Sequence, residues 1–123
     1  ADARQILKKQ IFLKDAIRQW GNIAGLVTGL LQRDYELIGR SLEDVIIEPV
    51  RSILIPAFAE VKKKSLGAGA LGGAIFMLSR KKNTALEVEK EMSSIYNRLG
   101  IENSTYVTTI NESGIKIVPD EIL

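Results

Sequence analysis

The sequence contains no cysteine and no histidine among its 123 residues. The lack of cysteine excludes disulfides, thiolate nucleophiles and cysteine-ligated metals, and it permits a reducing compartment such as the cytoplasm. The lack of histidine removes the commonest general base and the commonest transition-metal ligand, so Ser-His-Asp triads and histidine zinc sites are excluded. Any chemistry of this chain must therefore use carboxylates, arginine, lysine or backbone amides.

Excess charge and long apolar runs are also missing. The 17 Lys and Arg residues face 15 Asp and Glu residues, and no basic stripe alternates with aromatic residues, so we expect no nucleic-acid partner. Apolar runs such as residues 53–55 and 74–78 are far shorter than the roughly 18 residues of a membrane span. We therefore expect no membrane partner and a cytoplasmic location. The chain begins at Ala1 without a methionine or a signal-peptide pattern, which indicates a fragment or a processed chain.

Length and composition indicate one domain that spans residues 1–123. A chain that is 46% hydrophobic and 26% charged can form an ordinary core without disulfides or metals. Between Asp15 and Leu31 the apolar residues are three and four positions apart, which predicts a long helix. Gly21, Gly25 and Gly29 lie within it at intervals of four. Either another backbone approaches this stripe closely or a packed helix simply tolerates it, and both interpretations stay open.

Shorter helices are predicted on both sides of two prolines. Asp2 would cap a short helix over residues 2–7, and Ser41 with Asp44 would open another over residues 42–48, which Pro49 would end or kink. A further turn is expected between residues 34 and 39. Pro56 would open a helix that reaches Gly67.

The last third of the chain mixes strand and helix patterns. After the glycine-rich residues 67–73, the apolar run 74–78 is typical of a buried strand. Thr84 and Glu87 have the spacing of a capping box at the start of an amphipathic helix that Gly100 closes. Residues 104–110 and 115–118 are rich in β-branched residues and predict a hairpin. The order predicts an α+β domain in which helices pack on a small antiparallel sheet.

The glycine-rich stretch is the first candidate site. Gly69, Gly72 and Gly73 would let backbone amides approach a phosphate. The stretch lacks the Lys-Ser/Thr ending of a Walker motif, and it enters a strand where a Rossmann fingerprint would open a helix. A tight turn between a helix and a strand is the structural alternative.

Two arginines and three acidic residues are the other candidates. Arg4 and Arg51 each lie beside apolar residues, and a planar guanidinium can bind a carboxylate or a phosphate through two hydrogen bonds. The alternative for each is an ordinary surface or ion-paired arginine. Glu43, Asp44 and Glu48 could bind magnesium, although favourable charge at a helix start explains two of them. We assign no metal ligand.

Residues 34–58 resemble the C-terminal half of the homoserine kinase family, within the GHMP small-molecule kinase superfamily. Residues 48–51, Glu-Pro-Val-Arg, match its Glu-Pro-x-Arg motif, and residues 54–58, Leu-Ile-Pro-Ala-Phe, match Leu-Ile-Pro-Gly-Phe with Ala57 in place of glycine. Residues 3–7, Ala-Arg-Gln-Ile-Leu, resemble Ala-Arg-x-x-Leu. Residues 67–72 resemble the entry to the third conserved motif, so the likeness covers essentially the whole chain.

The resemblance implies a GHMP kinase C-terminal domain with a ferredoxin-like arrangement. It implies a parent enzyme that transfers the γ-phosphoryl group of ATP, with Mg²⁺, to the hydroxyl of L-homoserine in threonine biosynthesis. Arg4 and Arg51 would then bind the homoserine carboxylate, and Gly69, Gly72 and Gly73 would be the remnant of a phosphate loop. The catalytic base stays unassigned. The partners implied are L-homoserine and the N-terminal domain of the same enzyme, and a homodimer is left open.

Two departures from the family limit this interpretation. The N-terminal domain with the ATP loop is absent, so we expect the fragment alone to be inactive. The family's Ser-Gly-Ser-Gly-Pro turn is also missing between Gly73 and Ala74. Either the turn is deleted, or a mobile loop is absent from the sequence; we favour the second, because a phosphate-binding loop has few contacts without the nucleotide domain.

Three rival hypotheses stay open. A superfamily kinase for mevalonate or a sugar would not be expected to carry the motif that ends at Arg51. A stand-alone α+β module for small-molecule binding or dimerisation, without catalysis, would use residues 53–55 and the glycine stripe of residues 21–29 as its interface. A purely structural protein is the third.

Overall fold

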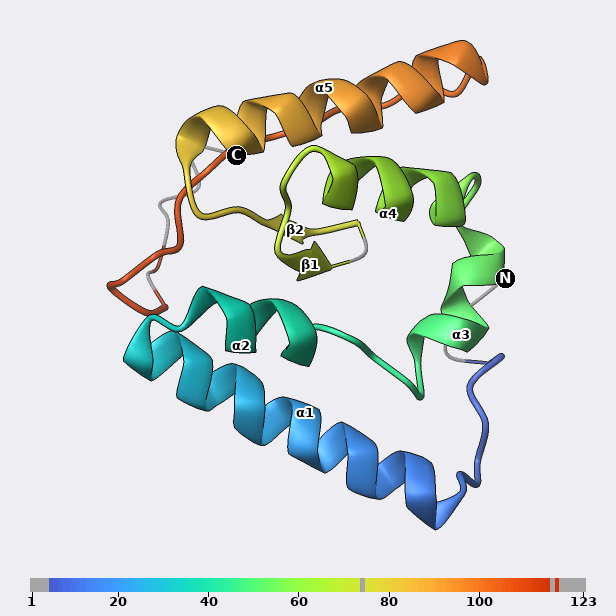
Figure 1. Cartoon of the computed structure of the whole chain (residues 1–123). Coiled ribbons are helices and arrows are strands. Elements are labelled where there is room, and N and C mark those ends of the chain that lie inside the picture. The colour runs from blue at the N-terminus through green and yellow to red at the C-terminus, as the bar shows by residue number, and fades with distance from the viewer. Residues whose placement is uncertain (1–4, 74, 116, 118–123) are drawn as a thin grey trace.

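The computed structural model describes residues 5–73, 75–115 and 117, and it confirms the α+β class (Figure 1). Its two described strands have two residues each and form one antiparallel hairpin. Gly72 pairs with Leu78, and Gly73 pairs with Met77. The elements are α1 (Leu13–Gln32), α2 (Tyr35–Ser41), α3 (Glu48–Arg51), the 3₁₀ turn η1 (Ser52–Leu54), α4 (Phe58–Gly67), β1 (Gly72–Gly73), β2 (Met77–Leu78) and α5 (Lys82–Arg98).

The hairpin separates two helical pairs. In Figure 1, α1 lies under α2 on one side of the hairpin, and α4 packs with α5 on the other side. Strand β1 contacts α2 and α4, and β2 contacts α5. The apolar residues that these contacts bury are Ala16, Ile38, Val61, Ala70, Val88 and Ile95. No helix in the described part of the chain is long and apolar enough to cross a membrane.

Two of the three glycines in α1 pack closely against α2 or the residue before it. A Cβ atom at Gly25 would lie 2.5 Å from Oγ of Ser41, and one at Gly29 would lie 3.0 Å from the backbone nitrogen of Ile38. A Cβ atom at Gly21 would meet nothing within 4 Å. The prediction of a close backbone approach is therefore confirmed for Gly29, whereas Gly25 meets side chains of α2 and Gly21 is merely tolerated. Because Gly25 and Gly29 pack inside the molecule, this part of the stripe is not an intermolecular interface.

Three local predictions in the first half are wrong. Residues 5–7 form a turn and a bend where a helix was expected, and Asp2 lies outside the described residues. Residues 42–47 form a loop where a second helix was expected, because the Asp44 carboxylate caps the backbone N–H groups of that loop. Pro49 lies in the first turn of α3, where a missing N–H group costs no helical hydrogen bond.

Two predictions around α4 and α5 also need correction. The helix up to Gly67 is confirmed, but it begins at Phe58, so Pro56 precedes its first turn. The helix that ends before Gly100 is confirmed as well, but it begins at Lys82. Thr84 is therefore its third residue and does not cap it.

The predicted strands are shorter or absent. Of the run 74–78 only Met77 and Leu78 form a strand, and Ala74 lies outside the described residues. Residues 104–110 form no strand, because they pair with neither of the two described strands; side-chain bonds hold this part of the chain on α5, where Asn103 accepts from Ser93 and Thr105 donates to Glu89. The other arm of the expected hairpin, residues 115–118, lies partly outside the described residues.

Candidate functional site

Arg51, one of the two predicted arginines, ends the short helix α3. Its side chain is exposed, and no described carboxylate forms an ion pair with it. Arg4 lies outside the described residues, so the expected convergence of the two guanidiniums stays a prediction. Among the described residues, therefore, no carboxylate competes with an anionic group from solvent for the planar donors of Arg51.

The loop that leads into α3 is fixed from two directions. From α1, Gln19 Oε1 accepts from the backbone N–H of Val45 at 3.1 Å, and Asn22 Nδ2 donates to the carbonyl of Glu43 at 2.7 Å. Within the loop, Oδ1 of Asp44 accepts from the N–H groups of residues 46 and 47, at 2.9 and 2.8 Å. These bonds replace a regular helix and set where α3 begins. Sequence reasoning missed Gln19 and Asn22, because polar residues on a helix face usually point to solvent.

Helix α3 is also tied to α4 by an ion pair. Lys62 Nζ contacts Oε1 of Glu48, and the two side chains are only 25% and 18% exposed. Lys62 also lies over the ring of Phe58, with Nζ 5.9 Å from the ring centroid. The acidic end of α3 is thus engaged, while the basic end, Arg51, is exposed.

The three acidic residues do not form a magnesium site. Glu43 pairs with Arg18 at 2.6 Å, the Asp44 carboxylate accepts from its own loop, and Glu48 pairs with Lys62. Among the described residues, no three metal-ligating side chains lie together. Each carboxylate therefore has a structural partner, and the magnesium interpretation is wrong for this set.

The amides of the glycine-rich stretch are used within the fold. The N–H groups of Gly69, Ala70 and Leu71 donate to the carbonyls of residues 66, 65 and 78 respectively. Gly72 and Gly73 form β1, and a Cβ atom at Gly72 would lie 2.7 Å from the Leu42 side chain. These contacts favour the structural alternative of a tight turn. A role in phosphate binding stays a prediction for Gly69, Gly72 and Gly73, and the amide bonding does not support it.

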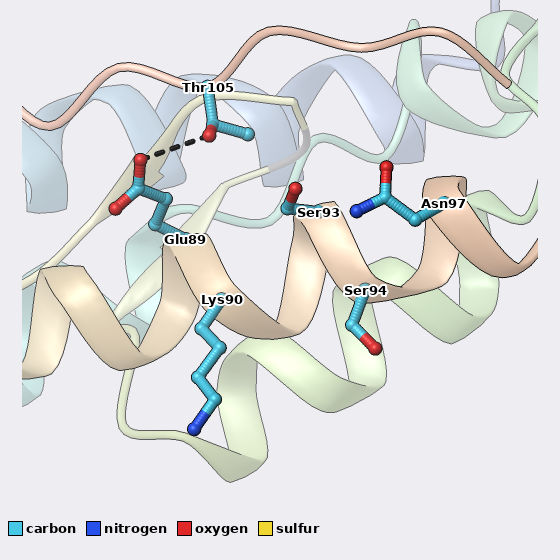
Figure 2. Close-up of a pocket in the computed structure, with 6 residues that line it drawn as sticks. All are labelled: Glu89, Lys90, Ser93, Ser94, Asn97 and Thr105. Carbon is cyan, nitrogen blue, oxygen red and sulfur yellow. Dashed lines mark hydrogen bonds between the residues drawn. The ribbon is translucent and has the colours of Figure 1, made fainter.

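A shallow polar hollow of about 450 Å³ lies along α5, and no sequence motif predicts it (Figure 2). Thr105 Oγ1 donates to Oε1 of Glu89 at 3.0 Å on one side of the helix. Figure 2 shows Lys90 and Ser94 pointing away from that pair. The charged groups of Glu89 and Lys90 therefore do not converge on one point of the hollow.

Known proteins resemble this chain over nearly its whole length. A homoserine kinase of Chloroherpeton thalassium is 45% identical over 124 residues, and one of Pyrococcus furiosus is 33% identical over 117 residues. These matches cover 94% and 89% of this chain but only 39% of each relative. The crystal structure of homoserine kinase from Cytophaga hutchinsonii superposes with a TM-score of 0.89 at 47% identity, covering 95% of this chain and 39% of that one.

The match to the Chloroherpeton protein has more aligned positions than this chain contributes residues. Its 124 aligned positions cover 94% of this chain, which is about 116 residues, so about eight positions hold a residue only in the Chloroherpeton protein.

The model of the family "GHMP kinases C terminal" matches residues 26–98, which extend from the middle of α1 to the end of α5. This match includes α3, the glycine-rich stretch and the hairpin, and covers more than half of the chain. The chain therefore belongs to the family of GHMP kinase C-terminal domains.

Proposed function

We propose that this chain is the C-terminal part of a homoserine kinase, in which Arg51 binds the carboxylate of L-homoserine. The observation that carries the proposal is the exposed guanidinium on a helix that three sets of polar contacts fix in place. Identity of 45% to a homoserine kinase over 94% of the chain supports it. Arg4, in the segment that resembles Ala-Arg-x-x-Leu, would be the second carboxylate ligand.

The described residues do not fit the phosphates of ATP or a magnesium ion. The N–H groups of Gly69, Ala70 and Leu71 donate within the fold, and no cluster of metal-ligating side chains occurs in residues 5–73, 75–115 and 117. In the proposal, ATP with Mg²⁺ supplies the phosphoryl group from an N-terminal domain of the same polypeptide. The role of this chain is to hold homoserine in place. Positioning of the acceptor hydroxyl against ATP accounts for much of the catalysis of phosphoryl transfer. This chain alone would be inactive, and the enzyme would be cytoplasmic, where ATP and free amino acids are available.

The test is ATP-dependent ADP formation by the full-length protein that contains this chain, with L-homoserine as the varied substrate. Replacing Arg51 by Ala removes a charge-assisted contact worth about 1.5–3 kcal/mol, so we expect KM for homoserine to rise about tenfold or more. KM for ATP should stay the same. Arg40→Ala, an exposed arginine at the end of α2, is the matched control and should change neither constant.

Two results would contradict the proposal. If homoserine does not stimulate ADP formation by the unsubstituted protein, the assigned substrate is wrong. If Arg51→Ala leaves KM for homoserine unchanged, the enzyme assignment stands but Arg51 is not part of the binding site. Mevalonate and a hexose should be offered as competing substrates, because a different superfamily kinase would respond to one of them.

We further propose that the N-terminal domain packs against the outer face of α1. Apolar side chains on this helix are strongly exposed: Leu13 68%, Trp20 63%, Val27 52% and Leu31 82%. The relatives are about two and a half times as long as the part that this chain matches, which leaves ample sequence to cover such a face. Two measurements test this proposal. In gel filtration the full-length protein should be monomeric, and in urea denaturation Leu31→Glu should lower its free energy of unfolding. A dimer that Leu31→Glu dissociates would favour the homodimer or the dimerisation module.

A further inference from the structure

Glu48 and Arg51 lie three residues apart on α3, a spacing that places the two side chains on one helix face. An acidic and a basic residue at this spacing commonly pair with each other. Here the carboxylate of Glu48 pairs with Lys62 of α4 instead, in a contact where both side chains are mostly buried. The Phe58 ring beside Nζ of Lys62 further restrains the lysine.

We propose that Lys62 is a positioning residue for ligand binding. By pairing with Glu48, it keeps that carboxylate from neutralising Arg51, so the guanidinium stays available to a carboxylate ligand. The inference rests on the proposed function, in which that ligand is L-homoserine. Lys62 lies on α4 and need not touch the substrate.

Charge balance gives the reason why the pairing matters. Without Lys62, Glu48 would be a mostly buried carboxylate with no counterion, and Arg51 one turn along the same helix is the cation closest in sequence. An Arg51 guanidinium paired with Glu48 would have fewer donors for the ligand. An unpaired Glu48 would instead repel the ligand carboxylate. Both outcomes weaken homoserine binding without touching ATP.

The test measures steady-state kinetics on the full-length protein. Lys62→Met keeps the apolar stem and removes the charge; we expect KM for homoserine to rise about fivefold to tenfold, while KM for ATP stays the same. Lys63→Met is the matched control, because Lys63 is the exposed neighbour on α4 and should change neither constant. Partial unfolding does not confuse the result, since it lowers the amount of active enzyme but leaves KM unchanged.

Adding Glu48→Gln to Lys62→Met is the decisive experiment. If Lys62 acts by neutralising Glu48, removing the carboxylate should return KM for homoserine close to its original value. Lys62→Arg, which keeps the charge, should also retain a nearly normal KM. A purely structural role predicts that the double variant is no better than Lys62→Met. That result, or an unchanged KM in Lys62→Met, would overturn the inference.

The two proposals fail in different ways. The proposed function fails if the unsubstituted protein shows no homoserine-dependent ADP formation or if Arg51→Ala leaves KM for homoserine unchanged. The inference about Lys62 fails by itself if Arg51→Ala raises that KM and Lys62→Met does not.

Discussion

Gly29 of α1 lies directly against Ile38 of α2: a Cβ atom at residue 29 would be 3.0 Å from both the backbone nitrogen and Cγ1 of Ile38. It would also be 3.2 Å from the carbonyl oxygen of Asp34. Two of these three neighbours are backbone atoms, one within α2 and one at its N-cap residue Asp34, so they cannot rotate away as the end of a side chain would. The junction of α1 and α2 therefore depends on glycine at this position.

Replacing Gly29 by Ala should destabilise the chain. Overpacking against the backbone costs about 1–3 kcal/mol, and the better helix propensity of alanine returns up to about 1 kcal/mol. We expect a net loss of about 1–2 kcal/mol in the free energy of unfolding, measured by urea denaturation.

Gly21→Ala is the matched control, because a Cβ atom there meets nothing within 4 Å in the same helix. It should stabilise the chain by about 0.5–1 kcal/mol, since only helix propensity changes. Equal effects of the two substitutions would show that the packing of α1 on α2 differs from that described.

The sequence allows the long amphipathic helices to be predicted but not the loop before α3. The apolar spacing in α1 and α5 depends only on local periodicity, and both helices form where it predicts them. The capping pattern of Ser41 and Asp44 predicts a helix over residues 42–48, yet residues 42–47 form a loop. The Asp44 carboxylate caps this loop, and Gln19 and Asn22, more than 20 residues earlier, bind its backbone. Such long-range contacts leave no local pattern. The pairing of Glu48 with Lys62 joins residues 14 positions apart and could not be predicted for the same reason, while the role of Arg51 stays a prediction from its motif.

Ala57 should accept glycine with a gain in stability. It precedes α4 with φ at 54°, in the left-handed region, where a Cβ atom costs about 1–2 kcal/mol. Glycine avoids this cost but loses about 0.4–1 kcal/mol through the greater freedom of the unfolded chain. We expect Ala57→Gly to raise the free energy of unfolding by about 0.5–1 kcal/mol in a thermal or chemical melt.

Ala59→Gly is the control for Ala57→Gly, because Ala59 is exposed in the first turn of α4. It should lower stability by up to about 1 kcal/mol through helix propensity alone. A loss of stability at both positions would mean that residue 57 does not adopt a left-handed conformation.

Asp44 should contribute to stability as a backbone acceptor and not as a charge. Its Oδ1 accepts from the N–H groups of Ile46 and Ile47, which have no helix to satisfy them. Asp44→Ala should lower the free energy of unfolding by about 1–2 kcal/mol, as expected for loss of a capping side chain. Asp44→Asn keeps an oxygen in the same place and should cost less than half as much. If the two variants are equally destabilised, charge is the cause and the hydrogen bonds are not.

Gly73 ends β1 at the start of the connection to β2. Gly73 has φ at 126°, and a Cβ atom there would collide with the carbonyl oxygen of Phe76. Ile75 and Phe76 lie in the same connection, with 55% and 90% of their surfaces exposed.

The match to the Chloroherpeton protein contains about eight positions that this chain lacks. We predict that the natural protein carries these residues between Gly73 and Ala74. Mass spectrometry tests this directly, because trypsin cuts after Lys64 and Arg80 and at no residue between them. The peptide from residue 65 to residue 80 should be heavier than its sequence by the mass of about eight residues. A mass equal to that of the sequence would show that the turn is deleted, and the amide groups for a phosphate would then have to come from another part of the enzyme.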